Sequence, residues 1–323
     1  MPLSEFSLIE RYFAAHDLHR PDVVLGIGDD CALLLPPAGQ QLVVTLDTLV
    51  ADVHFFAAAD PESLGHKALA VNLSDLAAMG AIPAWATLAL TLPKADEDWL
   101  ERFCRGLFAL ADRYGVQLVG GDTTHGPATV ITLQVHGFVP PEQALRRDGA
   151  KPGDGIYVSG TPVDAGLALA LAYGKTTAVS GHSRYLQTRL DWPEPRIAQG
   201  VALRGVASAA IDVSDGLAQD LGHILERSRS GAWLEVDRLP LSLALTSSLD
   251  RDTAIATALA GGDDYELCFT VPPERAARLD TVVADWDCRC TRIGVITAEP
   301  GLRLVRVDGS AFHLDRPGYD HFG

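Results

Sequence analysis

The chain has 323 residues, of which 47% are hydrophobic, and its formal net charge is −16. This length allows a substantial core and two domains of ordinary size. The negative charge argues against nucleic-acid binding, which depends on Lys and Arg that neutralise phosphates, and against an anionic membrane surface. An acidic protein can still bind phosphates when metal ions carry positive charge between them.

The five cysteines are scattered and odd in number. The one close pair, Cys288 and Cys290, has a single intervening residue, which is the wrong spacing for a zinc knuckle. We therefore expect reduced thiols in a cytoplasmic protein. The first residues lack a basic segment followed by an apolar run, so we expect no signal peptide. The longest apolar stretch, residues 165–173, is too short to cross a membrane.

In the first half of the chain, helical and strand-like patterns alternate, which favours an α/β or α+β fold. Ser7 and Glu10 have the spacing of a capping box and predict a helix start. An apolar, β-branched run predicts a buried strand at 42–46. Asp60-Pro61 predicts the start of a helix that Gly80 ends. Further expected elements are a strand at 85–92, a helix at 96–114 closed by Gly115, and strands at 116–119 and 130–139.

A turn at residues 151–154, with Pro and Gly at its centre, indicates a domain boundary. It divides the chain into an N-terminal domain, residues 1–150, and a C-terminal domain, residues 151–323. After the boundary we expect strands at 156–159, 209–211, 266–271, 291–296 and 302–307, and helices at 165–173, 217–229 and 273–286. Residues 176–189 show neither the periodicity of a helix nor that of a strand clearly.

Aspartates gather at the ends of apolar strands and in glycine-rich turns, which is unusual for surface carboxylates. Six segments show this pattern: Gly26–Asp30, Thr45–Thr48, Asn72–Asp75, Gly120–Thr123, Asp212–Gly216 and Gly261–Asp264. The second and fourth are expected to end strands, and the fifth lies between a strand and a helix. The third places Asn72 and Asp75 on one face of a helix.

Each segment alone also has a structural explanation. A Gly-Asp-Asp sequence is usually a turn, Asp47 alone fits a strand-end cap, and Asp212–Gly216 alone fits a helix N-cap. It is the combination of six that indicates chemistry. Mg²⁺ prefers oxygen ligands and bridges carboxylates to phosphates, and the helix starting at Leu217 is expected to offer free N–H groups to an anion. We therefore expect an enzyme that holds Mg²⁺ against nucleotide phosphates.

Common phosphate-binding signatures are missing from the sequence. There is no Walker-type glycine-lysine loop and no protein-kinase catalytic loop. The glycines of Gly26-Ile-Gly-Asp29 are not followed by the third glycine of a dinucleotide fingerprint.

Taken in order, the six segments resemble those of the thiamine-monophosphate kinases, a family of the aminoimidazole-ribonucleotide-synthetase-like superfamily. The resemblance spans nearly the whole chain. Two runs are specific to the family, Asn-Leu-Ser-Asp-Leu-Ala-Ala-Met-Gly at 72–80 and Gly-Tyr-Asp-His-Phe at 318–322. The Gly-Asp-Asp and Asp-Val-Ser-Asp-Gly loops at 28–30 and 212–216 are shared more widely in the superfamily.

The resemblance implies an α/β (α+β), two-domain synthetase-like fold. Its N-terminal mixed sheet with helices binds metal and ATP and dimerises through the sheet, and a C-terminal α/β sandwich domain completes the active site. ATP and thiamine monophosphate are the implied substrates, and several Mg²⁺ ions the implied cofactors. The implied protein is a cytoplasmic homodimer without nucleic-acid or membrane partners.

The resemblance also implies roles for individual residues. The implied magnesium ligands are Asp30, Thr45, Leu46 through its backbone carbonyl, Asp47, Asp75, Asp122, Asp212 and Asp215. The implied ATP contacts are Gly121, Asp122, Ser214 and either Arg146 or Arg147, of which Arg147 keeps the better spacing. The implied contacts to thiamine monophosphate are His54, Asp263 and Tyr319, and Tyr319, Phe322 or Trp85 is expected to stack on the thiamine rings.

One departure from the family concerns the substrate contact. The family usually has Gly-Gly-Glu-Asp-Tyr-Glu, whereas this chain has Gly-Gly-Asp-Asp at 261–264, so Asp263 is one methylene shorter. The pocket is then slightly tighter, or a water molecule fills the gap.

The implied reaction needs no general base because its acceptor is an anionic phosphate. The barrier is charge repulsion, about 4 kcal/mol for two unit charges roughly 4 Å apart at an effective dielectric near 20. Magnesium-assisted, direct in-line transfer is therefore expected. The aspartate segments occur in both predicted domains, so we expect the site to form where the domains meet.

Several alternatives stay open. A purine-biosynthesis synthetase has the same fold. A selenophosphate synthetase is expected to have a reactive cysteine in a glycine-rich N-terminal loop, and none is found. A carbamoyl-dehydration partner of hydrogenase maturation is expected to end in cysteine, whereas this chain ends in Phe322-Gly323. From another class, a non-catalytic metal or nucleotide sensor on the same fold fits the same segments.

Overall fold

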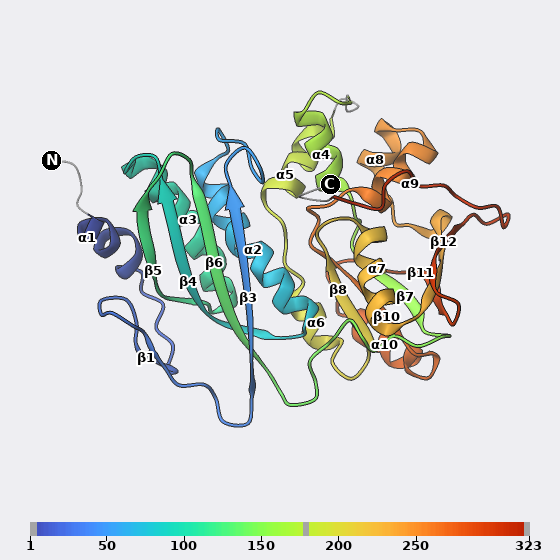
Figure 1. Ribbon diagram of the computed structural model, residues 1–323, viewed down its shortest axis with the longest axis horizontal. Helices are drawn as coiled ribbons and strands as arrows, with labels where there is room; N and C mark the ends of the chain where they lie inside the picture. The colour runs from blue at the N-terminus through green and yellow to red at the C-terminus, as the bar shows by residue number, and fades with distance from the viewer. Residues whose placement is uncertain (1–4, 177–180, 320–323) are drawn as a thin grey trace. The chain divides into compact units, whose positions relative to one another are not determined.

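The computed structural model describes residues 5–176 and 181–319. Two compact units make up the chain: unit 1 consists of Met1–Leu76 and Ala81–Glu142, and unit 2 of Ala77–Gly80 and Gln143–Gly323. Each unit combines a sheet with helices (Figure 1). Within the described ranges, every helix is too short or too polar to traverse a bilayer.

The described part of unit 1 contains a four-stranded mixed sheet. Its order is β3 (Gln41–Val50), β6 (Val130–Val139), β4 (Ile82–Leu92) and β5 (Gln117–His125). Strands β4 and β5 are parallel, whereas the other neighbours are antiparallel. A short ribbon of β1 (Val23–Leu25) and β2 (Leu33–Leu34) packs against Trp85, Val119 and Phe138 of the sheet.

Two long helices, α2 (Pro61–Ala78) and α3 (Glu97–Tyr114), lie beside the sheet of unit 1 (Figure 1). Their boundaries follow local signals. Asp96 caps α3 by accepting a hydrogen bond from the Trp99 N–H at 3.2 Å, and Gly115 ends it at φ 64°. The helices approach closely at Gly65, where a Cβ atom would lie 2.0 Å from the Phe103 carbonyl oxygen. Glycine is therefore required at this crossing.

The two faces of the unit 1 sheet differ in exposure. Leu88, Leu133 and Val135 are buried on the face toward the helices. The opposite face, here called the open face, exposes four apolar side chains: Leu42 (48%), Val44 (48%), Leu46 (56%) and Ile82 (52%). The predicted strand at 42–46 is confirmed, but its predicted burial is wrong, because alternate residues of β3 point to the open face.

The described residues of unit 2 form a six-stranded mixed sheet and several shorter helices. The strand order is β12 (Gly301–Val305), β9 (Gly231–Glu235), β11 (Cys290–Thr297), β7 (Gly155–Ser159), β10 (Glu266–Val271) and β8 (Ala209–Val213). The helices are α4 (Asp164–Ala172), α5 (Ser183–Asp191), α6 (Ile197–Ala202), α7 (Leu217–Ser228), α8 (Leu243–Ser248), α9 (Arg251–Ala260) and α10 (Ala276–Val283), with 3₁₀ turns at Val236–Arg238 and Pro273–Arg275. Among these six described strands, only β12 and β9 are parallel neighbours.

The core of unit 2 is assembled from buried strand and helix residues of widely separated segments, such as Ile156, Leu221, Leu234 and Leu259. On β7 and β10, Tyr157 and Phe269 stack with ring centroids 5.6 Å apart. Strands β7, β8 and β10 are almost entirely buried, which agrees with the apolar runs that predicted them.

Three predictions about local structure are wrong. Ser7 lies inside α1 (Glu5–Leu8), which continues as a π-helix over Ile9–Ala14, so Ser7 is not an N-cap. Asp47 does not end its strand, because β3 continues to Val50, and Asp122 does not end its strand, because β5 continues to His125. Hydrogen-bond pairing with a neighbouring strand extends both strands beyond their apolar runs.

Candidate active site

Three of the predicted magnesium ligands meet on the helix-facing side of the unit 1 sheet. The Thr45 hydroxyl donates a hydrogen bond to Asp75 Oδ2, which joins β3 to α2. Asp47 points to the same face as Thr45, because it is two residues further along the strand. Burial, together with the nearby Asp75 carboxylate, raises the pKa of Asp47 to about 7. Two carboxylates and a hydroxyl form the kind of oxygen donor set that suits Mg²⁺.

Asp122 lies on the opposite, open face of the same sheet. It is in register with Ala89, which pairs with Thr132, and the Thr132 hydroxyl is 2.9 Å from that of Thr48 on the open face. Three strand spacings, about 14 Å in all, separate β3 from β5. Within one chain, Asp47 and Asp122 therefore cannot bind the same ion, since Mg²⁺ ligands lie roughly 2 Å from the metal.

The other two predicted unit 1 ligands are not part of a preformed cluster. Asp30 is exposed between β1 and β2, and its N–H donates to Asp29 Oδ1 at 2.9 Å. Leu46 pairs with Gln134 in the β3–β6 ladder and points to the open face. Across residues 5–176 and 181–319, no three His, Cys, Asp or Glu side chains are grouped so that they could hold a metal ion.

In unit 2, Asp212 lies at the end of β8, and Ser214 and Asp215 lie in the loop between β8 and α7. Asp212 is 4% exposed. The buried Asp220, in the first turn of α7, accepts hydrogen bonds at 3.1 Å from the N–H groups of Ser214, Asp215 and Gly216. The prediction that this helix start offers free N–H groups to an anion is wrong for these three, because a carboxylate of the chain itself occupies them.

Asp220 was not identified from the sequence. Burial raises its pKa to about 6, although its three backbone hydrogen bonds act in the opposite direction. The sequence signal is an acidic residue in the first turn of a helix, which is too common to single out one carboxylate.

Two further segments of unit 2 attach to this loop. The Asp263 N–H donates to the Ser214 carbonyl at 2.8 Å, and the Tyr319 N–H donates to the Asp215 carbonyl at 3.0 Å. The Gln219 side chain also donates to the Tyr319 carbonyl at 2.8 Å. Unit 2 thus brings together one predicted metal ligand, one predicted ATP contact and two predicted substrate contacts.

The two candidate arginines differ in their contacts. The Arg146 guanidinium donates to both carboxylate oxygens of Asp148, at 2.9 and 2.5 Å. The Arg147 carbonyl accepts a hydrogen bond from the Ser228 hydroxyl at 2.8 Å, and its side chain is exposed. The ion pair engages Arg146, so the preference for Arg147 remains a prediction.

The predicted aromatic and histidine contacts are also located. His54 follows β3, and its Nδ1 accepts a hydrogen bond from the Val50 N–H at 3.0 Å, which leaves the proton of the neutral ring on Nε2. Trp85 is 1% exposed and donates to Asp22 Oδ1 at 3.0 Å, so its expected stacking on a ligand is wrong. Phe322, with the end of the 318–322 run, lies outside the described residues.

Glu266, three residues after Asp263, is the centre of a buried ionic network that the sequence did not reveal. Glu266 accepts two hydrogen bonds from Arg196, at 2.7 and 2.6 Å, and one each from Arg189 at 3.0 Å and Ser159 at 2.6 Å. Burial alone would raise the pKa of Glu266, but these cations and donors outweigh it and hold the pKa below its ordinary value. The three residues that donate to Glu266 lie 70 to 107 residues before it in the sequence, so no local pattern indicates these contacts.

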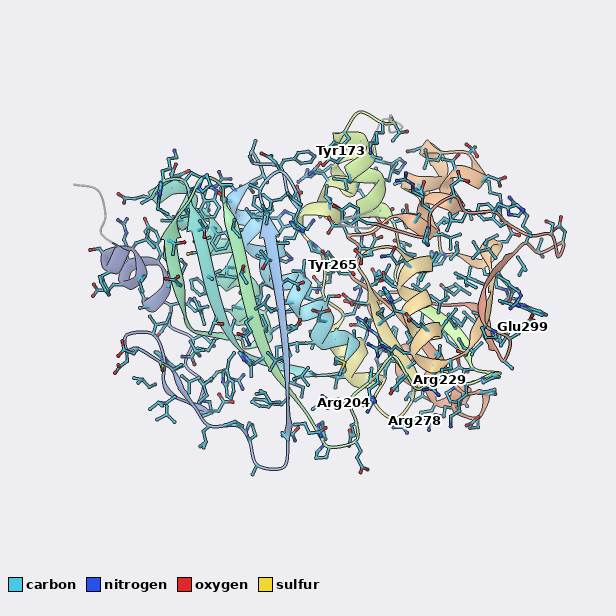
Figure 2. The ribbon with its side chains drawn as sticks, in the orientation of Figure 1. Tyr173, Arg204, Arg229, Tyr265, Arg278 and Glu299 are labelled. Carbon is cyan, nitrogen blue, oxygen red and sulfur yellow. The ribbon has the colours of Figure 1, made fainter. Side chains whose placement is uncertain are left out.

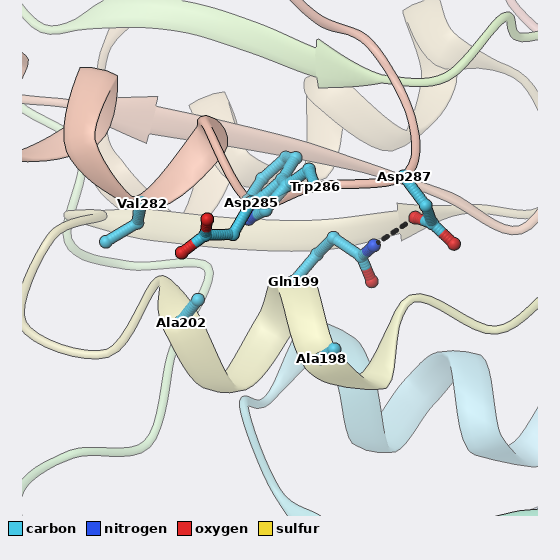
Figure 3. Close-up of a pocket in the computed structure, with 7 residues that line it drawn as sticks. All are labelled: Ala198, Gln199, Ala202, Val282, Asp285, Trp286 and Asp287. Atoms are coloured by element: carbon cyan, nitrogen blue, oxygen red, sulfur yellow. Dashed lines mark hydrogen bonds between the residues drawn. The ribbon is translucent and has the colours of Figure 1, made fainter.

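Unit 2 also has a cavity of about 430 Å³ between α6 and the end of α10 (Figure 3). It is lined by Ala198, Gln199, Ala202, Val282, Asp285, Trp286 and Asp287. Gln199 donates to Asp287 Oδ1 across its rim at 2.7 Å. None of the predicted site residues lines this cavity.

Comparison with known protein families shows the class of protein to which the chain belongs. Residues 28–139 match the N-terminal domain, and residues 151–307 the C-terminal domain, of AIR synthase related proteins. The chain therefore has the two-domain α/β fold of that class, with a mixed sheet in each half.

The relatives define the family. The chain is 53% identical to thiamine-monophosphate kinase of Escherichia coli (strain K12), over 100% of this chain and 99% of the relative. The crystal structure of thiamine-monophosphate kinase from Stenotrophomonas maltophilia K279a is 50% identical, with a TM-score of 0.86 over 96% of this chain and 98% of that one. AaThiL complexed with AMPPCP and TMP is 30% identical, with a TM-score of 0.77 over 99% and 97%. The chain belongs to the thiamine-monophosphate kinase family of enzymes.

Proposed function

We propose that this chain transfers the γ-phosphoryl group of ATP directly, by in-line displacement, to the phosphate of thiamine monophosphate, giving thiamine diphosphate and ADP in the cytoplasm. Family membership makes it a kinase, a transferase that uses ATP in thiamine diphosphate biosynthesis. The observation that carries the mechanism is the grouping of Thr45, Asp47 and Asp75 on one face of the unit 1 sheet.

Magnesium is the proposed cofactor because the donor set fits it. Two close carboxylates and a hydroxyl supply oxygen ligands and leave positions for water and phosphate. The proposed ligands are Asp30, Thr45, the Leu46 carbonyl, Asp47, Asp75, Asp122, Asp212 and Asp215. When bound, Mg²⁺ reduces the repulsion between the donor and acceptor phosphates.

The remaining residues are proposed to bind and orient the two substrates. Gly121, Asp122, Ser214 and Arg147, or Arg146 in its place, contact ATP. His54, Asp263 and Tyr319 contact thiamine monophosphate, and the tyrosine ring stacks on the cationic thiazolium, worth about 0.5–2 kcal/mol. No side chain is assigned as a general base, because the acceptor oxygen is already anionic.

Both predicted domains are proposed to act on the same nucleotide. Residues 1–150 supply metal and ATP ligands and the dimerisation surface, and residues 151–323 complete the active site. The support is that predicted ATP contacts occur in both parts of the sequence, Gly121 in one and Ser214 in the other.

We also propose a homodimer formed through the open face of the unit 1 sheet. Four exposed apolar side chains, Leu42, Val44, Leu46 and Ile82, lie on this face, which favours contact with another protein surface. A second copy covers such a patch with an identical one by two-fold symmetry. Asp122 points to the same face, so dimerisation also changes the surroundings of a proposed metal ligand.

The experiment that tests the proposed function is direct product detection. The purified chain is incubated with ATP, Mg²⁺ and thiamine monophosphate, and thiamine diphosphate and ADP are quantified. We expect both products in equal amounts, and none when Mg²⁺ is chelated. Thermal stabilisation by ATP, Mg²⁺ and thiamine monophosphate without either product would instead identify a sensor on the same fold.

A further inference from the structure

The segment that connects α9 to β10 has an unusual backbone. Asp263 and Tyr265 have φ angles of 73° and 57°, in the left-handed region that residues with side chains seldom adopt. An aromatic residue there is a clear outlier, and two such residues flank Asp264. Backbone strain of this kind persists only where surrounding contacts hold it, and it is concentrated at functional sites.

Hydrogen bonds to the end of β8 and to the residue after it hold this strained backbone. The N–H groups of Asp263 and Tyr265 donate to the carbonyls of Ser214 and Val213, at 2.8 and 2.9 Å. Gly262 has no room for a side chain, because a Cβ atom would lie 2.1 Å from the Ser214 carbonyl oxygen. The segment is thereby fixed along the loop that carries Ser214.

Asp264 anchors the centre of the segment from below. It is 1% exposed, and its carboxylate accepts hydrogen bonds from the N–H groups of Val163 and Ala165, the latter at 3.3 Å. Val163 itself has a φ angle of 90°. Asp264 thereby ties the centre of the segment to the start of α4.

This arrangement places the Tyr265 side chain against the carboxylate of Asp263. The Tyr265 hydroxyl donates a hydrogen bond to Asp263 Oδ1 at 2.8 Å, and Tyr265 itself is only 9% exposed. Figure 2 labels the position of Tyr265 in the chain. A buried, rigid ring therefore holds one carboxylate oxygen of a residue that is one methylene shorter than the glutamate usual in the family. This bond restricts which of its staggered rotamers the Asp263 side chain adopts.

We propose that Tyr265 is a positioning residue that fixes the orientation of the Asp263 carboxylate for the cationic thiamine part of the acceptor substrate. The inference rests on the proposed contact between Asp263 and thiamine monophosphate. Tyr265 acts through Asp263 and before substrate binds, because it removes the rotamer freedom that binding would otherwise have to restrict. The transferring phosphoryl group is handled by other residues, so the effect is on substrate binding and not on the chemical step.

The test is steady-state kinetics of the full chain, with thiamine monophosphate varied at saturating ATP and Mg²⁺. Tyr265→Phe removes only the hydroxyl and is expected to raise KM for thiamine monophosphate about three- to tenfold, with kcat changed less than about twofold. The matched control is Tyr185→Phe, which removes a hydroxyl that donates to Asp164 at 2.6 Å. This control is expected to leave KM unchanged.

Asp263→Asn separates the positioning inference from the proposed function. If Asp263→Asn leaves KM for thiamine monophosphate unchanged, the proposed substrate contact is wrong and the inference falls with it. If Asp263→Asn raises KM but Tyr265→Phe does not, the contact stands and the positioning role is overturned. Equal losses in Tyr265→Phe and Tyr185→Phe also overturn it. In the Asp263→Asn background, we expect Tyr265→Phe to add less than about twofold.

Discussion

Replacing Asp220 should release the loop that carries Ser214 and Asp215. In Asp220→Ala, three N–H groups lose the carboxylate oxygen that accepts them at 3.1 Å. The appropriate reference is Asp220→Asn, which keeps an oxygen acceptor in nearly the same place. Comparing two neutral side chains also removes the cost of burying a charge, which raises the pKa of the native carboxyl to about 6.

The magnitude follows from the burial of the three bonds. The bond from Gly216 is fully buried, so its loss should cost about 2 kcal/mol, whereas those from Ser214 and Asp215 are partly buried, so water can replace part of each. With about 0.5–1 kcal/mol for each of these two, Asp220→Ala should be about 3–4 kcal/mol less stable than Asp220→Asn.

Two measurements report this difference. Urea unfolding followed by circular dichroism gives the change in stability, and hydrogen exchange of the amides of residues 214–216 reports the loop itself. We expect faster exchange at these amides in the alanine variant than in the asparagine variant. If the variants agree within about 1 kcal/mol and all three amides remain protected, Asp220 does not hold the loop.

Three other predictions concern packing, ionisation and assembly. Gly65→Ala should destabilise the chain by about 3 kcal/mol in urea unfolding, because the added Cβ atom would collide with the backbone of Phe103. Gly222→Ala in α7, whose Cβ atom would meet nothing within 4 Å, should stabilise the chain by about 0.5–1 kcal/mol. Equal effects of the two substitutions would contradict this reasoning. A hydrogen bond from an arginine lowers the pKa of Asp22 below 3.8, so the stability it provides is present above pH 3.8 and is lost as the pH falls through the folded value. Asp22→Asn should therefore cost about 1–2 kcal/mol at pH 7 and less near pH 3, and a pH-independent cost would be evidence against it. Val44→Asp should shift a dimer to monomer in light scattering while the exposed Val307→Asp does not; a dimer unchanged by Val44→Asp would rule out the open face.

Much of the secondary structure could be predicted because local signals are strong. The predicted helix at 96–114, closed by Gly115, is confirmed as α3, and the structure adds that Asp96 is its N-cap. The strands at 130–139 and 266–271 were predicted with correct boundaries, because both are continuous runs rich in apolar and β-branched residues. By contrast, β9 and helices α6, α8 and α9 were not predicted, since their short apolar runs gain stability only from tertiary packing.

The candidate site was predicted as a set of residues but not as an arrangement. The sequence identified Asp47 and Asp122 as carboxylates of one site, yet strand pairing puts them on opposite faces of one sheet. The periodicity of a strand fixes which residues share its face, but not which strand lies beside it. The same limit explains why Asp220 and Tyr265 were missed: each acts through a neighbour that only the folded chain defines.

The central claim is that the aspartates hold Mg²⁺ for phosphoryl transfer. The most direct measurement is thiamine diphosphate formation at increasing Mg²⁺ by the native chain and by Asp47→Asn, Asp122→Asn and Asp212→Asn. The exposed Asp285→Asn serves as the control. We predict at least about a hundredfold loss of turnover in the three variants, with folding preserved, and full activity in the control. Full activity of all three variants at low Mg²⁺ would contradict the account.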